Sequence, residues 1–362
     1  MSSNRWGHID SIRGIAALMV VYFHTAESAW KFNLISNNIE GSIFHFIAAW
    51  LDLGKIPVVM FFAISGFVIP FSLLRTQDRP LRNFAITRFF RLYPGYWFSM
   101  LLGIIFLYFW HGVPISSKQI VANITMLQEL LGQKHILGLY WTLQIELIFY
   151  FIAAGMFWFG LLQRPDAVVK ASLFFLGCAL IFALTTTLVG KKMPTALPLS
   201  LSIMFWGLSW RYRQTDDSDP RVGPMSNWLT IAIIVFVPIV SWLGYNSERN
   251  IGDTWYRYTI TYYTAIALFI TLTTYVRITH RVFVWLGLIS YSVYLMGPIA
   301  QTIVQTLIGP DLTRQMPFHV IIVLTMALTI LISHFTHKYV EAPSQQFGRK
   351  LAGRKSPSPE PI

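Results

Sequence analysis

Ten long apolar segments constrain the fold of this chain more than any other feature. We place them at residues 12–30, 56–74, 84–109, 141–162, 168–189, 195–210, 227–245, 256–276, 283–308 and 317–339. Most approach the ~20 residues that a helix needs to cross a membrane. Charged residues make up only 12% of the chain, against about a quarter in a typical soluble domain. The sequence therefore predicts an all-α, polytopic integral membrane bundle of about ten transmembrane helices.

The distribution of basic residues predicts the orientation of the bundle. With a cytoplasmic N-terminus, nineteen of the 28 Lys and Arg residues fall on the cytoplasmic side. This excess predicts that both termini are cytoplasmic. It also accounts for the net charge of +12, so no nucleic-acid partner is expected. We expect the first apolar segment to remain as a span and not to be cleaved as a signal peptide.

The apolar segments suggest one main domain and a tail. Residues 1–345 are expected to form a single transmembrane domain. Residues 346–362 are basic and contain several Pro and Ser residues, so we expect a disordered cytoplasmic tail. Glu341 and Pro343 are expected to end the last helix, because proline disfavours helix at the residue before it.

Arg13 and His24 give the first apolar segment two ionisable groups. They are eleven residues apart, so at about 100° per residue they lie within about 20° of one helix face. The rise between them is about 16 Å, which lets His24 reach the middle of the membrane while Arg13 stays at the cytoplasmic edge. A neutral imidazole there can act as a general base. The alternative is a structural histidine bonded to a neighbouring helix.

Asp10 is three residues from Arg13 and is expected to pair with it.

Glu146 is the other ionisable side chain expected inside a span. It lies five residues after Trp141, hence about 7–8 Å deeper along the helix. If Trp141 marks the outer interface, Glu146 and His24 approach each other in the outer half of the membrane. The carboxylate would then orient the imidazole or stabilise its charged form. The alternative is a protonated, hydrogen-bonded carboxyl group, or a carboxylate paired with a structural arginine.

A basic stretch precedes the third apolar segment. Arg88 and Arg91 lie three residues apart, on adjoining positions of one helix face. Guanidinium groups hold phosphates through paired hydrogen bonds, so these arginines are candidates for phosphate binding. Binding of anionic lipid, or the cytoplasmic excess of basic residues alone, also explains the stretch.

The remaining special residues are expected to have structural roles. In the second segment, Ser65, Gly66 and Pro70 predict close helix packing and a kink. Cys178 is the only cysteine and is expected to be a small core residue. Arg211, Arg213 and Arg221 are expected in a solvated loop beside Asp216, Asp217 and Asp219.

No metal site is expected. A single cysteine excludes a cysteine metal site within the chain. His334 and His337 are three residues apart, but no third ligand is evident, and polarity at a helix end explains them better.

Six stretches in sequence order match the motifs of a known family. They are HIDSIRGIAALMVVYFH at 8–24, FFAISGFVI at 61–69, RFFRLYPGYW at 88–97, YWTLQIELIFY at 140–150, LISYSVYL at 288–295 and VEAP at 340–343. Together they resemble the acyltransferase-3 family of membrane acyltransferases, and the resemblance covers almost the whole chain.

The resemblance implies a ten-helix enzyme that moves an acyl group, often acetyl, from cytoplasmic acyl-coenzyme A to a hydroxyl of a glycan or lipid-linked saccharide. In the family's motifs, His24 would be catalytic, with ten residues between it and Arg13. Arg88 and Arg91 fit an arginine motif on the cytoplasmic side. Glu146 fits a WSLxxE-like segment in which Thr142 stands where serine is common.

The short single-domain form resembles exopolysaccharide and O-antigen acetyltransferases of the bacterial plasma (inner) membrane. Acyl-CoA is then a donor substrate and not a permanently bound cofactor. Membrane lipids and polysaccharide-assembly proteins are the other expected partners.

One position departs from the family pattern. Many members carry histidine in a YLxH motif near the ninth span, where this chain has YLMG, so Gly297 takes its place. No role transfers to that position.

The resulting mechanistic hypothesis places Arg13, Arg88 and Arg91 at the coenzyme A phosphates and His24 at the acceptor hydroxyl. A ternary complex and an acyl-enzyme remain alternatives. Acylation of a lipid or a small molecule is the alternative acceptor chemistry. A proton-coupled transporter would also use buried ionisable groups, although the chain has no evident internal repeat of the kind common in transporters.

Overall fold

A computed structural model of the chain describes residues 7–31, 46–47, 50–74, 78–110, 112–215, 219–245 and 254–353. This part of the chain is helical and contains no strand. Its α-helices are α1 (Gly7–Lys31), α3 (Lys55–Val68), α4 (Phe71–Leu74), α5 (Pro80–Gly103), α6 (Ser117–Ile124), α7 (Tyr140–Trp158), α8 (Pro165–Val189), α9 (Ala196–Thr215), α10 (Val222–Tyr245), α11 (Trp255–Ile270), α12 (Arg281–Leu288), α13 (Ser290–Gln315), α14 (Phe318–Thr336) and α15 (Ala342–Leu351).

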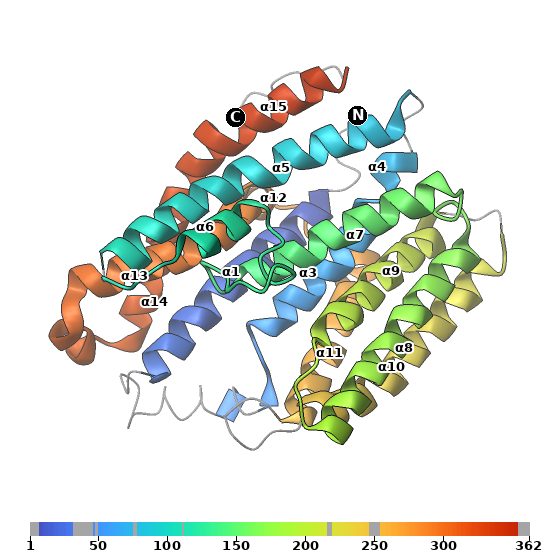
Figure 1. The fold of residues 1–362 in the computed structure, drawn as a ribbon, viewed down its shortest axis with the longest axis horizontal. Coiled ribbons are helices and arrows are strands. Elements are labelled where there is room, and N and C mark those ends of the chain that lie inside the picture. The colour runs from blue at the N-terminus through green and yellow to red at the C-terminus, as the bar shows by residue number, and fades with distance from the viewer. Residues whose placement is uncertain are drawn as a thin grey trace.

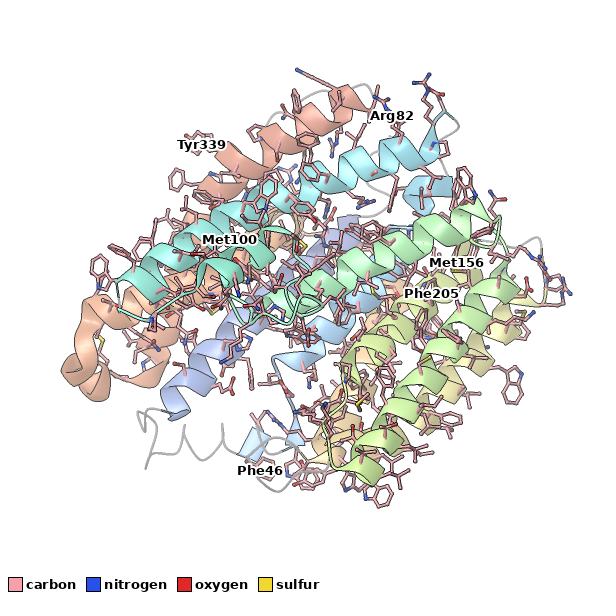
Figure 2. The ribbon with its side chains drawn as sticks, viewed as in Figure 1. Phe46, Arg82, Met100, Met156, Phe205 and Tyr339 are labelled. Atoms are coloured by element: carbon pink, nitrogen blue, oxygen red, sulfur yellow. The ribbon has the colours of Figure 1, made fainter. Side chains whose placement is uncertain are left out.

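Three π-helical segments continue α-helices. They are η1 (Ile104–Phe109) after α5, η2 (Thr271–Tyr275) after α11 and η3 (His337–Glu341) between α14 and α15. Most of the long helices run side by side along a common diagonal in Figure 1. In Figure 2, Arg82 lies at one edge of this bundle and Phe46 at the opposite edge.

A helix occupies each of the ten apolar segments, but fewer are long and apolar enough to cross a membrane. Six described helices meet that requirement: Lys55–Leu74, Pro80–Phe109, Tyr140–Trp158, Pro165–Val189, Val222–Tyr245 and His319–Leu351. Helices α12 and α13 make a seventh if this pair, bent by 71°, is one span. The chain is thus an all-α integral membrane protein. Ten spans and cytoplasmic termini remain predictions.

Helix α9 forms the centre of one half of the bundle. Every residue from Pro198 to Tyr212 is buried, and α9 packs against α3 and α8 (Figure 1). A Cβ atom on Gly66 of α3 would lie 1.7 Å from the Met204 carbonyl oxygen, and one on Gly207 would lie 2.1 Å from that of Ala63. The two backbones therefore touch through glycines, as in other membrane helix pairs.

The close helix packing predicted for the second segment is confirmed. Gly66 is a point of close helix approach, and the helix breaks at Ile69 and Pro70 before α4 begins.

A second close crossing joins α1 to α12. A Cβ atom on Gly287 would lie 2.0 Å from the carbonyl oxygen of Asp10, and one on Gly14 would lie 2.7 Å from the Gly287 nitrogen. This crossing fixes the first turns of α1, which carry Asp10 and Arg13, against the bundle.

Three expectations about element boundaries are wrong. The segment expected at 195–210 continues to Thr215, so Arg211 and Arg213 are helical and do not lie in a loop. The segment expected at 283–308 is broken between α12 and α13, with Ile289 at the junction. The last helix does not end at Pro343, because η3 and α15 continue the chain to Leu351.

The expected disordered tail begins with ordered structure. Residues 346–351 belong to α15, which packs along α5 with Gly348 against the ring of Phe90 (Figure 1). Residues 354–362 lie outside the described part of the chain.

Candidate active site

A cavity of about 740 Å³ lies between α1, α3, α4, α5, α7, α9 and α13. This volume falls within the roughly 300–1,000 Å³ of typical ligand pockets. From Val58 to Val68 of α3, the cavity extends over about 15 Å, since a helix rises 1.5 Å per residue. The side chains that line it differ in chemistry between its two ends.

Arginines gather at the end near α4 and the first turns of α1. Arg13, Arg88 and Arg91, the three predicted phosphate-binding residues, all line the cavity. Nη1 of Arg13 lies 3.9 Å from Oδ1 of Asp10, which confirms the predicted pair. Arg13 and Arg88 are each close enough to Arg91 for electrostatic repulsion. The predicted shared face of Arg88 and Arg91 on α5 is therefore confirmed.

Arg88 is held in place by neighbours on three elements. Its Nη2 donates a 2.9 Å hydrogen bond to Oγ of Ser72. Its guanidinium carbon lies 5.4 Å from the ring centre of Phe84 and 5.6 Å from that of Tyr150. A guanidinium group fixed by a hydrogen bond and ring faces loses less conformational entropy when it binds a ligand.

Glu146 supplies a carboxylate at this arginine-rich end. The hydroxyl of Tyr150 donates a 2.5 Å hydrogen bond to its Oε1. Glu146 also interacts electrostatically with Arg13 and Arg88. This environment matches the alternative in which the carboxylate pairs with arginines. No contact between Glu146 and His24 occurs among the described residues.

Arg211 is a fourth arginine in the cavity, and the sequence analysis missed it. Its side chain is 4% exposed, and it reaches the cavity from the last turns of α9. The neighbouring Asp216, Asp217 and Asp219 indicated a solvated loop. A signal for burial was present in the apolar and aromatic residues of LSIMFWGLSWRY before and around it.

Hydroxyl groups line the other end of the cavity. Oγ1 of Thr142 lies 2.7 Å from the hydroxyl of Tyr294, and both side chains are buried. The ring of Tyr294 packs edge-on against Phe61. This end is therefore apolar with a small number of oxygen donors and acceptors.

His24 lies on α1 beyond this cavity. Its side chain is 50% exposed, and Nδ1 lies 3.7 Å from Oε2 of Glu27 on the same helix. The adjacent Phe23 packs on Gly54, where a Cβ atom would lie 2.5 Å from Cδ1 of its ring. Val58, at the cavity end, is four residues from Gly54. The cavity thus ends about 6 Å, one helical turn, short of Phe23.

Gly297 packs directly against α1. A Cβ atom there would lie 2.9 Å from Cγ2 of Val21. A larger side chain at this position would contact Val21 and require the Val21 side chain to shift.

The other titratable residues that the structure describes lie in small separate groups. Among the described residues, no group of three or more His, Cys, Asp or Glu side chains could hold an ion. His337 lies 3.2 Å from Oε2 of the buried Glu341, whose other oxygen accepts a hydrogen bond from Ser292. His334 packs against Trp285, and Cys178 is partly buried.

Comparison with known proteins identifies one family. The model of a family described as an acyltransferase domain matches residues 6–335. No curated protein and no solved structure matches the chain.

Proposed function

Because the chain belongs to the acyltransferase-3 family of membrane acyltransferases, we propose that it transfers an acyl group, in the simplest case acetyl, from cytoplasmic acyl-CoA. The acceptor is a hydroxyl of a glycan or lipid-linked saccharide. The protein then acts in the bacterial plasma membrane, beside the machinery that assembles exopolysaccharide.

The observation that supports this proposal best is the difference in chemistry between the two ends of the cavity. Arg13, Arg88 and Arg91 meet at one end, and the opposite end is apolar with the hydroxyls of Thr142 and Tyr294. Acyl-CoA has a matching division, with phosphates at one end and a long, weakly polar pantetheine arm that carries the thioester. Guanidinium groups bind phosphates strongly in a site of low dielectric constant.

Within this proposal, Glu146 orients the arginines. Its electrostatic partners are Arg13 and Arg88, and its hydrogen bond from Tyr150 fixes the carboxylate. Glu146 thereby keeps like-charged guanidinium groups together before the donor binds.

His24 is the proposed general base at the far end of the pantetheine arm. It lies about 16 Å along α1 from Arg13 and about one turn beyond the end of the cavity. In the transfer step, its imidazole takes the proton of the acceptor hydroxyl. The hydroxyl oxygen attacks the thioester carbonyl, the bond between carbon and sulfur breaks, and the leaving coenzyme A thiolate recovers the proton.

The test of this function is acyl transfer from radiolabelled acetyl-CoA to membrane glycans in vesicles. His24→Ala is expected to lower the rate by at least about 100-fold at matched protein level, as for removal of a general base. His280→Ala, which removes an exposed histidine before α12, is the control and should retain full activity.

Two results would contradict the proposal. Equal labelling with wild type and His24→Ala would exclude His24 as an essential base. No transfer by the wild type to any glycan, with either acetyl or longer acyl donors, would exclude the assigned reaction.

A further inference from the structure

Arg211 is a buried cation with specific partners in the cavity wall. Its Nη1 donates a 2.8 Å hydrogen bond to the carbonyl oxygen of Phe67. Its guanidinium carbon lies 3.8 Å from the ring centre of Phe71 and 5.2 Å from that of Phe67. These contacts hold the planar group at the break between α3 and α4.

The position of Arg211 offsets part of the cost of burying its charge. Phe67 is in the last turn of α3, where the helix dipole is negative and attracts a cation. The face of an aromatic ring adds a second favourable interaction.

The charges that line the cavity indicate the kind of ligand that fits. Four arginines, Arg211 included, face two carboxylates, Asp10 and Glu146. With all six groups ionised, the described residues that line the cavity carry an excess of two positive charges. A buried excess of this size favours a ligand with several negative charges.

We propose that Arg211 binds a phosphate group of the acyl-CoA donor, together with Arg13, Arg88 and Arg91. This inference rests on the proposed function, because it takes acyl-CoA as the ligand. It adds a donor-binding residue on α9 to those on α1 and α5.

The experiment measures binding of acyl-free coenzyme A, so that acyl transfer is not needed as a readout. The dissociation constant is determined for the purified full-length protein in lipid nanodiscs. Arg211→Gln removes the charge and keeps a donor for the Phe67 carbonyl. Loss of a charge-assisted hydrogen bond should raise the dissociation constant roughly 10- to 100-fold.

Arg213→Gln is the matched control. Arg213 lies on the same helix with its guanidinium carbon 4.4 Å from the ring centre of Trp210, and it does not line the cavity. Its substitution removes the same charge and should change the dissociation constant by less than about twofold.

A second ligand, 3′-dephospho-coenzyme A, identifies the phosphate. If Arg211 binds the 3′-phosphate, Arg211→Gln should weaken coenzyme A binding and leave binding of the dephospho form unchanged. If Arg211 binds the pyrophosphate, Arg211→Gln should weaken the binding of both ligands equally. Either result supports the proposal.

If Arg211→Gln binds both ligands as tightly as the wild type does, the role of Arg211 is overturned and the proposed function is left intact. Failure of the wild type to bind coenzyme A would overturn both. If Arg211→Gln does not fold, Arg211→Lys replaces it. Lysine lacks the planar fork, so the dissociation constant should rise at least about threefold, and an unchanged value would overturn the proposal.

Discussion

At Glu146, one carboxylate lies within electrostatic reach of Arg13 and Arg88. Removing its charge leaves the buried guanidinium groups to repel one another. Glu146→Gln should therefore lower the midpoint of thermal unfolding of the ligand-free protein by on the order of 2–5 °C. Saturating coenzyme A should restore most of this loss, because its phosphates replace the missing counter-charge.

The control for Glu146 is Tyr150→Phe, which removes the hydrogen bond to Oε1 and keeps the carboxylate. Coenzyme A should shift the midpoint of this variant by the same amount as that of the wild type. An equal shift in Glu146→Gln and the wild type would contradict the assignment of Glu146 to the arginines.

Individual site residues could be predicted where their spacing on one helix carried the information. Arg88 and Arg91 were predicted on one face because three residues separate them, and both line the cavity. The partner of Glu146 could not be predicted, since it depends on how α7 packs against α1 and α5. Arg211 was missed because nearby acidic residues suggested solvent, whereas α9 continues past it.

Among the helices, the crossing of α3 and α9 depends on glycine. Gly66→Ala would place a methyl group 1.7 Å from the Met204 carbonyl oxygen, so the helices must separate. Overpacking of this kind costs about 1–3 kcal/mol or more. We expect the midpoint of thermal unfolding in detergent to fall by on the order of 1–4 °C.

Gly177→Ala is the comparison for this prediction. Gly177 lies within α8, and a Cβ atom there meets no heavy atom within 4 Å. Since alanine favours a helix by about 1 kcal/mol over glycine, this variant should be at least as stable as the wild type. Equal stability of Gly66→Ala and Gly177→Ala would show that the α3–α9 crossing is not tightly packed.

The positions of the helices could be predicted from apolar length, and their interruptions could not. The 71° bend between α12 and α13 falls at Ile289, nine residues before Pro298, so no proline marks it in the sequence. It depends on the packing of α12 against α1 through Gly14 and Gly287. The continuation of the last helix past Pro343 is possible because proline is tolerated in the first turn of α15.

For the molecule as a whole, the predicted orientation can be tested by cysteine labelling. Cys178 is the only cysteine, so Cys178→Ala gives a background without thiols. In that background, Lys118→Cys should react with a membrane-impermeant maleimide in intact cells. Arg221→Cys should react only after the membrane is permeabilised, because positive charge predicts a cytoplasmic side. Reaction of both sites in intact cells, or the reversed pattern, would contradict this topology.

The number of spans was predicted from the sequence, but only six or seven described helices are apolar enough by themselves. Helix α9 shows why apolarity is an incomplete guide. It is buried by its neighbours, and Ser202 accepts a hydrogen bond from Ser172 of α8 within the bundle. A helix shielded by other helices does not need a lipid-compatible surface. Its hydrophobicity therefore underestimates how deeply it lies within the bundle.

The contact between Gly297 and Val21 has a consequence for substitutions at both positions. Val21 also packs with Ala17, Leu286, Ile289 and Val293, so α1 cannot retreat without disturbing that cluster. A larger residue at position 297 would displace the side chain of Val21 and so disturb that cluster, unless residue 21 were also smaller. The two positions are therefore coupled through packing, and substitutions at both are not expected to be additive in their effect on stability.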